Sequence, residues 1–387
     1  MGASDAYRWL RAAIAAAIVG FSALLMWSPA GAAASSPSGT LGVYRGAGNP
    51  AKIAEWEAWI GHSAYRVTDS FDRTSWTAMT DPWAANQWKG TGYQVVYSLP
   101  MLPLSGASLS EEAKGTYNDY FRRIAQNLIN AGQPSAVLRI GWEMNGNWYP
   151  WSIATNPNGA ADYVAAWRQI VDTMRSVPGA AFSFDWTVDR GGSWVNGVQV
   201  DPSQAYPGDQ YVDYVGMDVY DHDWADGYQD PIQRWRNLMD DRYGLAWQRD
   251  FAAAHGKPMT FPEWGLSDRT DGHGGGDDPY FIEQMYNWIS QNNVAYQMYF
   301  EYDETNAYHA LMTGHFPLGA ARFRDLFGPN SPPPPATGDG GSTSTPPIQP
   351  PTDPVTQPPT TGGTGTTSKP KRKPRRARAR AARRRHP

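Results

Sequence analysis

The residues of this chain that could carry chemistry gather around two glutamates. Glu143 lies in the run Trp-Glu-Met-Asn-Gly-Asn-Trp at 142–148, directly after an apolar run at 136–140 that predicts a short buried strand. Glu263 ends a second such run at 258–263 and is followed by another tryptophan. Because burying a carboxylate is costly, two carboxylates that follow apolar strands and stand beside tryptophan indicate function.

This combination of residue types suits the hydrolysis of glycosidic bonds. Apolar surroundings raise the pKa of a carboxyl group, so that it can protonate the leaving oxygen of a sugar, and indole faces stack on sugar rings. The sequence therefore indicates a glycoside hydrolase. The structural alternatives are an ion pair between Glu143 and Arg139 and, for Glu263, a helix cap or an exposed acid.

Short β-rich runs alternate with helical stretches through a body of roughly 290 residues, a length typical of an α/β barrel. The predicted strands are 41–44, 64–67, 94–99, 136–140, 181–186, 214–219, 258–263 and 295–300. The predicted helices are 51–60, 111–131, 160–177, 242–255 and 280–293. Eight strands with intervening helices predict a (β/α)8 TIM barrel, and a doubly wound open sheet is the alternative. No glycine-rich phosphate loop follows a strand, so we expect no cofactor.

Charge and composition narrow the class of protein further. Residues 40–330 hold 20 Lys+Arg against 34 Asp+Glu, whereas 369–387 hold 11 basic residues and no acidic ones. The acidic body argues against nucleic acid as the substrate, because phosphates would be repelled. The chain contains no cysteine, which excludes thiolate metal ligands and disulfides, so its core must stabilise it.

The predicted organisation is a secretory signal peptide at 1–34, one catalytic domain at 40–328, a Pro/Thr/Gly-rich linker at 329–368 and a disordered basic tail at 369–387. An uncleaved membrane anchor is the alternative for the first segment. We expect a secreted monomer. The basic tail could bind nucleic acid, an anionic wall polymer or an acidic lipid. Given the predicted export, we favour retention at an anionic cell surface, and an inert solvated segment is the alternative.

Three segments, in the order of the chain, resemble motifs of glycoside hydrolase family 26: 139–151, which contains Glu143-Met144-Asn145-Gly146, then 211–220 and 257–265. The resemblance covers roughly residues 40–327. It implies a (β/α)8 barrel with the acid/base after strand four and the nucleophile after strand seven. It also implies activity on β-mannans or, in some members, on mixed β-glucans or β-xylans.

On this resemblance, Glu143 is the general acid and then base, and Glu263 is the nucleophile of a retaining double displacement. Retention requires the two carboxyl groups to lie about 5–5.5 Å apart. Tyr220 is expected to hydrogen-bond Glu263, and Arg139 to tune the charge nearby. The residues predicted to contact a polysaccharide substrate are Arg139, Trp142, Asn145, Trp148, Trp151, Trp186, Tyr220 and Trp264. For any one of these indoles, a place in the core is the alternative.

Trp142 is the one departure from the family pattern, which normally has histidine immediately before the acid/base. That histidine would contact sugar at the cleavage subsite, so the substrate is a β-mannan, a related β-glucan or another glycan. The alternatives are a relative with cellulase-like specificity or a bacterial wall polysaccharide as substrate, and a non-catalytic glycan-binding barrel.

Two other segments contain groups that bind ligands in other proteins. His222, beside Asp223 and Trp224, either contacts substrate or has no functional role. The segment 268–278 is rich in Asp and Gly and could hold calcium, but its spacing is not that of a helix-loop-helix site, so we favour a mobile loop beside the cleft. The remaining histidines lack metal-ligand spacing, and we predict no metal site.

Overall fold

The structure, a computed structural model, describes residues 37–329. The predicted signal segment, the linker from residue 330 onward and the basic tail lie outside the described residues. The predicted catalytic body at 40–328 lies within them. In the described part of the chain, no helix is both long enough and apolar enough to cross a membrane.

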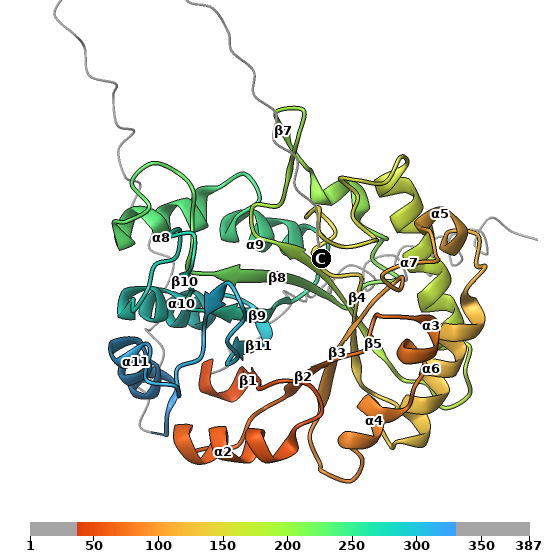
Figure 1. Cartoon of the computed structure of the whole chain (residues 1–387), viewed down its shortest axis with the longest axis horizontal. Helices are drawn as coiled ribbons and strands as arrows, with labels where there is room; N and C mark the ends of the chain where they lie inside the picture. Colours follow the sequence, from red (N-terminus) through yellow and green to blue (C-terminus); the bar gives the residue numbers. More distant parts are fainter. Residues whose placement is uncertain (1–36, 330–387) are drawn as a thin grey trace, which may run out of the picture. The chain divides into compact units, whose positions relative to one another are not determined.

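Eight parallel strands close into a barrel, which confirms the predicted (β/α)8 fold (Figure 1). The barrel strands are β1 (Leu41–Tyr44), β2 (Val67–Ser70), β3 (Val95–Leu99), β4 (Val137–Ile140), β5 (Ser183–Asp189), β8 (Tyr214–Tyr220), β9 (Met259–Gly265) and β11 (Val294–Phe300). Neighbours in the barrel follow the order of the chain, and β1 pairs with β11 to close the ring. The C-terminal ends of all eight strands therefore meet at one rim.

Helices surround the strands (Figure 1). They are η1 (Pro37–Thr40), α2 (Pro50–Ile60), α3 (Trp76–Met79), α4 (Trp83–Gln87), α5 (Leu109–Glu112), α6 (Asn118–Asn130), α7 (Gly159–Arg175), η2 (Pro202–Ala205), α8 (Pro231–Asp240), α9 (Leu245–Ala254), α10 (Pro279–Gln291) and α11 (Pro317–Phe327). Two short antiparallel pairs decorate the barrel, β6 (Trp194–Val195) with β7 (Val198–Gln199) and β10 (Asp268–Arg269) with β12 (Ala307–Tyr308).

Side chains alternate between the polar interior of the barrel and the apolar layer under the helices, because successive residues of a strand point to opposite faces. On β5, Asp185 points inward and accepts hydrogen bonds from Thr260, at 2.6 Å, and from Tyr296. Its neighbour Trp186 points outward and packs against Phe251 of α9, with ring centroids 5.5 Å apart. Neighbouring residues of β5 therefore lie in different surroundings: Asp185 is in the polar interior of the barrel, and Trp186 is in the apolar layer under the helices.

A bulge in β9 interrupts this alternation and positions one of the two glutamates. Gly216 of β8 pairs with Thr260, but Val219 pairs with Trp264, so β9 has one residue more than β8 between these pairs. Thr260 faces into the barrel. The extra residue reverses the order of faces, so Glu263 also points inward while Trp264 points outward.

Some predicted boundaries are wrong. The second strand begins at Val67 rather than spanning 64–67, because its polar Thr68 and Asp69 are buried in the barrel and break the apolar pattern. The helix predicted at 111–131 is two helices, α5 and α6, separated at Gly115, whose φ of +78° no α-helix can contain. The sequence analysis also omitted α3, α4, α8 and α11.

Candidate active site

Glu143 follows β4 in an unusual backbone conformation. Its φ is +53°, a left-handed value that is uncommon for residues other than glycine and that costs on the order of 1–3 kcal/mol. Gly141, two residues earlier, also has a positive φ of +49°. The amide of Glu143 donates to the carbonyl of Thr187 on β5 at 3.0 Å, which ties this turn to the next strand. Strain of this kind is tolerated where the surrounding structure holds a functional side chain in place.

Asn145 ties the same loop to the end of β5. Its side-chain amide donates to the carbonyl of Asp189 at 2.8 Å, and its side-chain oxygen accepts from the Asp189 amide at 2.9 Å. Asn145 is fully buried. The prediction that Asn145 contacts substrate is therefore wrong, because both of its polar ends are used to position the loop that carries Glu143.

Glu263 is held by two donors at the bottom of the site. The hydroxyl of Tyr220, the last residue of β8, donates to Glu263 Oε2 at 2.9 Å, which is the hydrogen bond that the resemblance implied. Arg139 of β4 forms ion pairs with both Glu263 and Asp218. Because the Arg139 side chain is entirely buried, its positive charge acts on these carboxylates with little screening by water. Both donors hold the carboxyl group of Glu263 in a fixed orientation.

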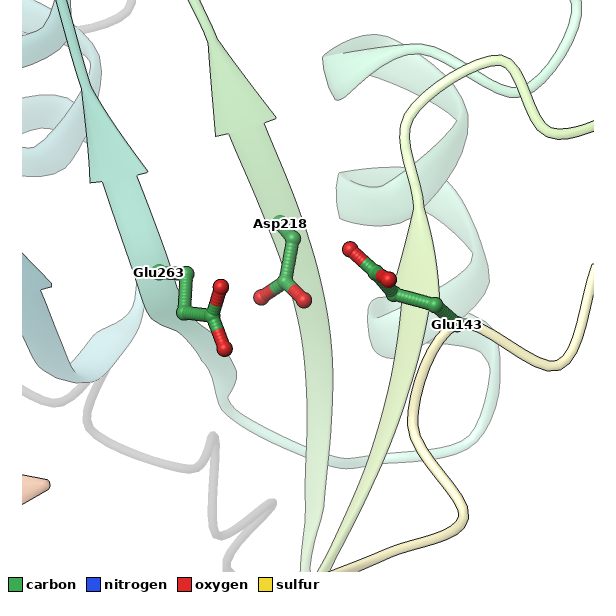
Figure 2. Close-up of side chains that lie close together, drawn as sticks. All are labelled: Glu143, Asp218 and Glu263. Carbon is green, nitrogen blue, oxygen red and sulfur yellow. The ribbon is translucent and has the colours of Figure 1, made fainter. Parts of the chain in front are cut away.

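Three carboxylates converge above Arg139. One oxygen each of Glu143, Asp218 and Glu263 lie within 4.8 Å of one another, and Figure 2 shows the three side chains approaching a common space from the β4 loop, β8 and β9. A cluster of this kind could ligate a cation, but Arg139 already donates to two of the three groups. The guanidinium therefore supplies positive charge that these carboxylates require when they are buried.

The surroundings of Glu143 shift the pKa of its carboxyl group. Burial, followed by the negative charges of Asp189 and Glu263, raises the pKa of Glu143 to about 8. Trp148 opposes this shift, because its indole Nε1 donates to Glu143 Oε2 at 2.8 Å. Burial likewise raises the pKa of Asp189 to about 6. At neutral pH, Glu143 is therefore mainly protonated and can act as an acid.

A cleft of ≈ 840 Å³ opens over the carboxylates at this rim of the barrel. Glu143, Glu263 and Tyr220 lie at its floor among its lining residues. Three tryptophans line it with their side chains about half exposed or more: Trp148, Trp194 of β6 and Trp224. The cleft thus combines acidic groups with accessible indole faces, as a site for a sugar chain requires.

Three other tryptophans that were predicted to line sugar subsites are fully buried in the core, and those predictions are wrong. Trp186 points away from the cleft and donates to the carbonyl of Ala205 at 3.1 Å. Trp264 packs against Phe281 and Phe323 of the outer helices. Trp151 donates its indole N–H to the carbonyl oxygen of Trp142 at 2.8 Å. Arg139 and Trp142, the latter only 5% exposed, do not line the cleft either.

His222 and the segment 268–278 have different roles in the structure. His222 does line the cleft, beside Trp224, with ring centroids 4.9 Å apart. In the segment 268–278 the carboxylates serve the fold: Asp277 accepts from two amides at the start of α11, and Asp278 caps α10. The first two residues of this segment form β10 (Asp268–Arg269), so, contrary to our expectation, the segment is not a loop throughout.

Tyr149, Asp189 and Trp194 are among the lining residues of the cleft that were not predicted from the sequence. The first two had a signal, since Tyr149 stands in the tryptophan-rich loop after the fourth strand and Asp189 at the end of the fifth, where barrel enzymes place functional groups. No sequence signal pointed to Trp194, because it lies on the β6–β7 hairpin, which is not one of the alternating strands and helices of the barrel.

A comparison with known families agrees with this geometry. Residues 84–240 match the model of glycosyl hydrolase family 26, a stretch that includes β4, β5, β8 and the Glu143 loop. Over this stretch, the chain is similar to glycosyl hydrolase family 26. This confirms the resemblance that three separate motifs indicated.

The chain is also similar in sequence to two proteins with named activities. It is 29% identical over 248 residues to endoglucanase H of Acetivibrio thermocellus, covering 61% of this chain, and 29% identical over 264 residues to a mannan endo-1,4-beta-mannosidase of Bifidobacterium adolescentis, covering 66%. The chain spans about a quarter of the length of each of these relatives, 25% in both cases. The solved structure of GH26C from Muricauda sp. MAR_2010_75 has the same fold, with 14% identity, a TM-score of 0.52, and coverage of 76% of this chain and 86% of that one.

Proposed function

We propose that this chain is an endo-acting glycoside hydrolase that cleaves a β-linked polysaccharide with retention of configuration. The observation that carries the proposal is the close approach of Glu143 and Glu263, whose oxygens lie within 4.8 Å. Carboxyl groups about 5–5.5 Å apart suit a covalent double displacement, whereas an inverting enzyme needs about 6.5–9.5 Å to admit a water molecule between them.

The surroundings of the two glutamates divide their roles. Glu143 is the general acid, because its raised pKa of about 8 keeps it protonated at neutral pH. It gives its proton to the leaving oxygen as the glycosidic bond breaks. Glu263 is the nucleophile: Arg139 and Tyr220 orient its carboxylate, which attacks the anomeric carbon and forms a glycosyl ester. Glu143, now ionised, then takes a proton from water, and the resulting attack of that water releases the sugar and restores both groups.

The substrate class that we propose is a β-mannan or a related β-glucan. This follows from the names of two relatives, a mannosidase and an endoglucanase, at equal identity. An open cleft lined by the indoles of Trp148, Trp194 and Trp224 is consistent with a polymer rather than a single sugar.

Reducing-sugar release from mannan, glucomannan, mixed-linkage glucan, cellulose and xylan tests the activity, with Glu263→Ala as the inactive control. Proton NMR of the first products tests retention, because the anomer formed initially must have the configuration of the substrate. Added azide separates the roles. In Glu143→Ala, azide attacks the glycosyl ester and gives a glycosyl azide of retained configuration. In Glu263→Ala it replaces the nucleophile and gives the inverted azide. Initial products of inverted configuration from the wild type would refute the mechanism.

We also propose that the protein is exported as a monomer and retained at an anionic surface by its basic tail. The proposal rests on the apolar N-terminal segment and the 11 basic residues at 369–387. Sequencing the N-terminus of protein recovered from culture medium would test export, and sedimentation with cell walls, with and without residues 369–387, would test retention. Analytical ultracentrifugation would test the oligomeric state.

A further inference from the structure

Trp142 precedes the general acid in the sequence, yet its side chain does not enter the cleft. The indole is buried, with 5% of its surface exposed, and its ring centroid lies 5.0 Å from that of Trp151. The guanidinium of Arg139 lies over the Trp142 ring, 5.4 Å from its centroid. The ring is therefore fixed by packing, and its one polar atom has a defined direction.

That polar atom binds a residue of the cleft wall. Trp142 Nε1 donates to the hydroxyl oxygen of Tyr149 at 3.0 Å, and Tyr149 is a lining residue of the cleft beside Glu143 and Trp148. An indole N–H can only donate, so Tyr149 must accept this hydrogen bond. The hydroxyl hydrogen of Tyr149 is then directed elsewhere, and within residues 37–329 no hydrogen bond of the structure gives it an acceptor.

The Tyr149 ring is also held in place, and it lies near the reacting groups. Its ring stacks on Trp151 with centroids 4.6 Å apart, and the guanidinium of Arg73 lies 4.9 Å from its centroid. Burial and the negative charges of Glu143 and Glu263 raise the pKa of Tyr149, so the hydroxyl is protonated at neutral pH. A rigid, protonated donor without a partner in the protein is suited to bind an oxygen of a ligand.

We propose that Tyr149 is a specificity-determining residue whose hydroxyl, oriented by Trp142, donates a hydrogen bond to a hydroxyl group of the sugar bound beside Glu143. Trp142 is a positioning residue in this arrangement, since it acts only through Tyr149. The inference rests on the proposed function, because it places a sugar in this cleft. Pyranoses that differ in the orientation of one hydroxyl would be distinguished by a donor fixed in this way.

The test is a double-mutant cycle of Tyr149→Phe and Trp142→Phe, with Tyr65→Phe, an exposed tyrosine outside the cleft, as the matched control. Two readouts are taken. One is kcat and KM on soluble glucomannan. The other is binding of mannohexaose and cellohexaose, followed by tryptophan fluorescence, in the Glu263→Ala background, which needs no turnover. Thermal unfolding of every variant reports on folding.

We expect Tyr149→Phe to lower kcat/KM and the affinity for the preferred hexaose roughly three- to tenfold, as for the loss of one hydrogen bond, and to reduce the ratio of affinities for the two hexaoses. Trp142→Phe should have a smaller effect, and none when Tyr149 is already phenylalanine. Unchanged affinity and kcat/KM in Tyr149→Phe, or effects of the two substitutions that simply add, would overturn the inference. So would a parent protein that binds neither hexaose.

These outcomes separate the inference from the proposed function. Hydrolysis that is insensitive to Tyr149→Phe would refute the inference alone. Binding that depends on Tyr149 in a protein that hydrolyses no polymer would refute the catalytic proposal alone.

Discussion

Replacing Asp189 with asparagine should move the basic limb of the pH–rate profile to lower pH. Asp189 ends β5 and lines the cleft, and its negative charge is the largest contribution, after burial, to the raised pKa of Glu143. With its own pKa near 6, Asp189 is ionised before Glu143, near 8, loses its proton. The charge is thus present when Glu143, the proposed general acid, titrates. Asparagine keeps the oxygen that accepts from the Gly192 amide, at 3.0 Å in the wild type.

The size of the shift follows from the loss of one buried like charge, which lowers the pKa of Glu143 by on the order of one unit. A carboxyl group acts as a general acid only below its pKa, so activity falls as the pH rises through that value. At pH 8, the protonated fraction of Glu143 would fall from about one half to about one tenth, so kcat/KM should drop about fivefold. Near pH 5.5, where Glu143 is protonated in both proteins, kcat/KM should be unchanged.

The assay is kcat/KM on soluble glucomannan from pH 4.5 to 10, because this parameter reports the ionisation of the free enzyme. Asp250→Asn is the matched control, since Asp250 lies exposed on α9 in an ion pair with Arg249. A basic limb of Asp189→Asn that stays in place or moves to higher pH would refute the electrostatic reasoning. A uniform loss at every pH would show instead that Asp189 acts on substrate binding or on the shape of the site.

Three other substitutions probe separate parts of the structure. Trp148→Phe removes a hydrogen bond that stabilises ionised Glu143, so the basic limb of the same profile should move to higher pH; movement to lower pH would contradict this. Arg139→Met leaves buried carboxylates unpaired and should lower the free energy of unfolding by about 3–5 kcal/mol, measured by urea denaturation; an unchanged midpoint would argue against a buried ion pair. Glu112, fully buried with neither oxygen hydrogen-bonded, has its pKa raised from 4.5 to about 9 by burial. The folded state therefore binds more protons than the unfolded state between these values, and stability falls as pH rises, by about 1.4 kcal/mol per unit. Glu112→Met should raise the Tm at pH 8 more than at pH 5, and equal changes would refute this account.

Much of the architecture could be predicted because it depends on local patterns. Eight short β-rich runs that alternate with helical stretches predict a barrel whatever the details of packing. The same patterns located Glu143 and Glu263 at strand ends. The second strand was misplaced because Thr68 and Asp69 are polar residues inside the barrel, where hydropathy no longer distinguishes interior from surface.

The assignment of tryptophans failed for a different reason. Trp186 and Trp264 stand next to inward-pointing residues, so strand alternation sends both into the apolar layer under the helices. For Trp186 this followed from alternation alone. For Trp264 it depends on the bulge in β9, which no residue type announces and which appears only in the pairing of β8 with β9.

The sequence by itself determined the barrel and the presence of two glutamates with aromatic neighbours. Only the tertiary structure decided what surrounds each of them. Arg139 contacts Glu263 across 124 residues, and Asp189 and Tyr149 share a cleft with both glutamates, because closure of the barrel brings the ends of all its strands to one rim. The pKa of Glu143 depends on burial and on charges from other strands, and these are properties of that convergence.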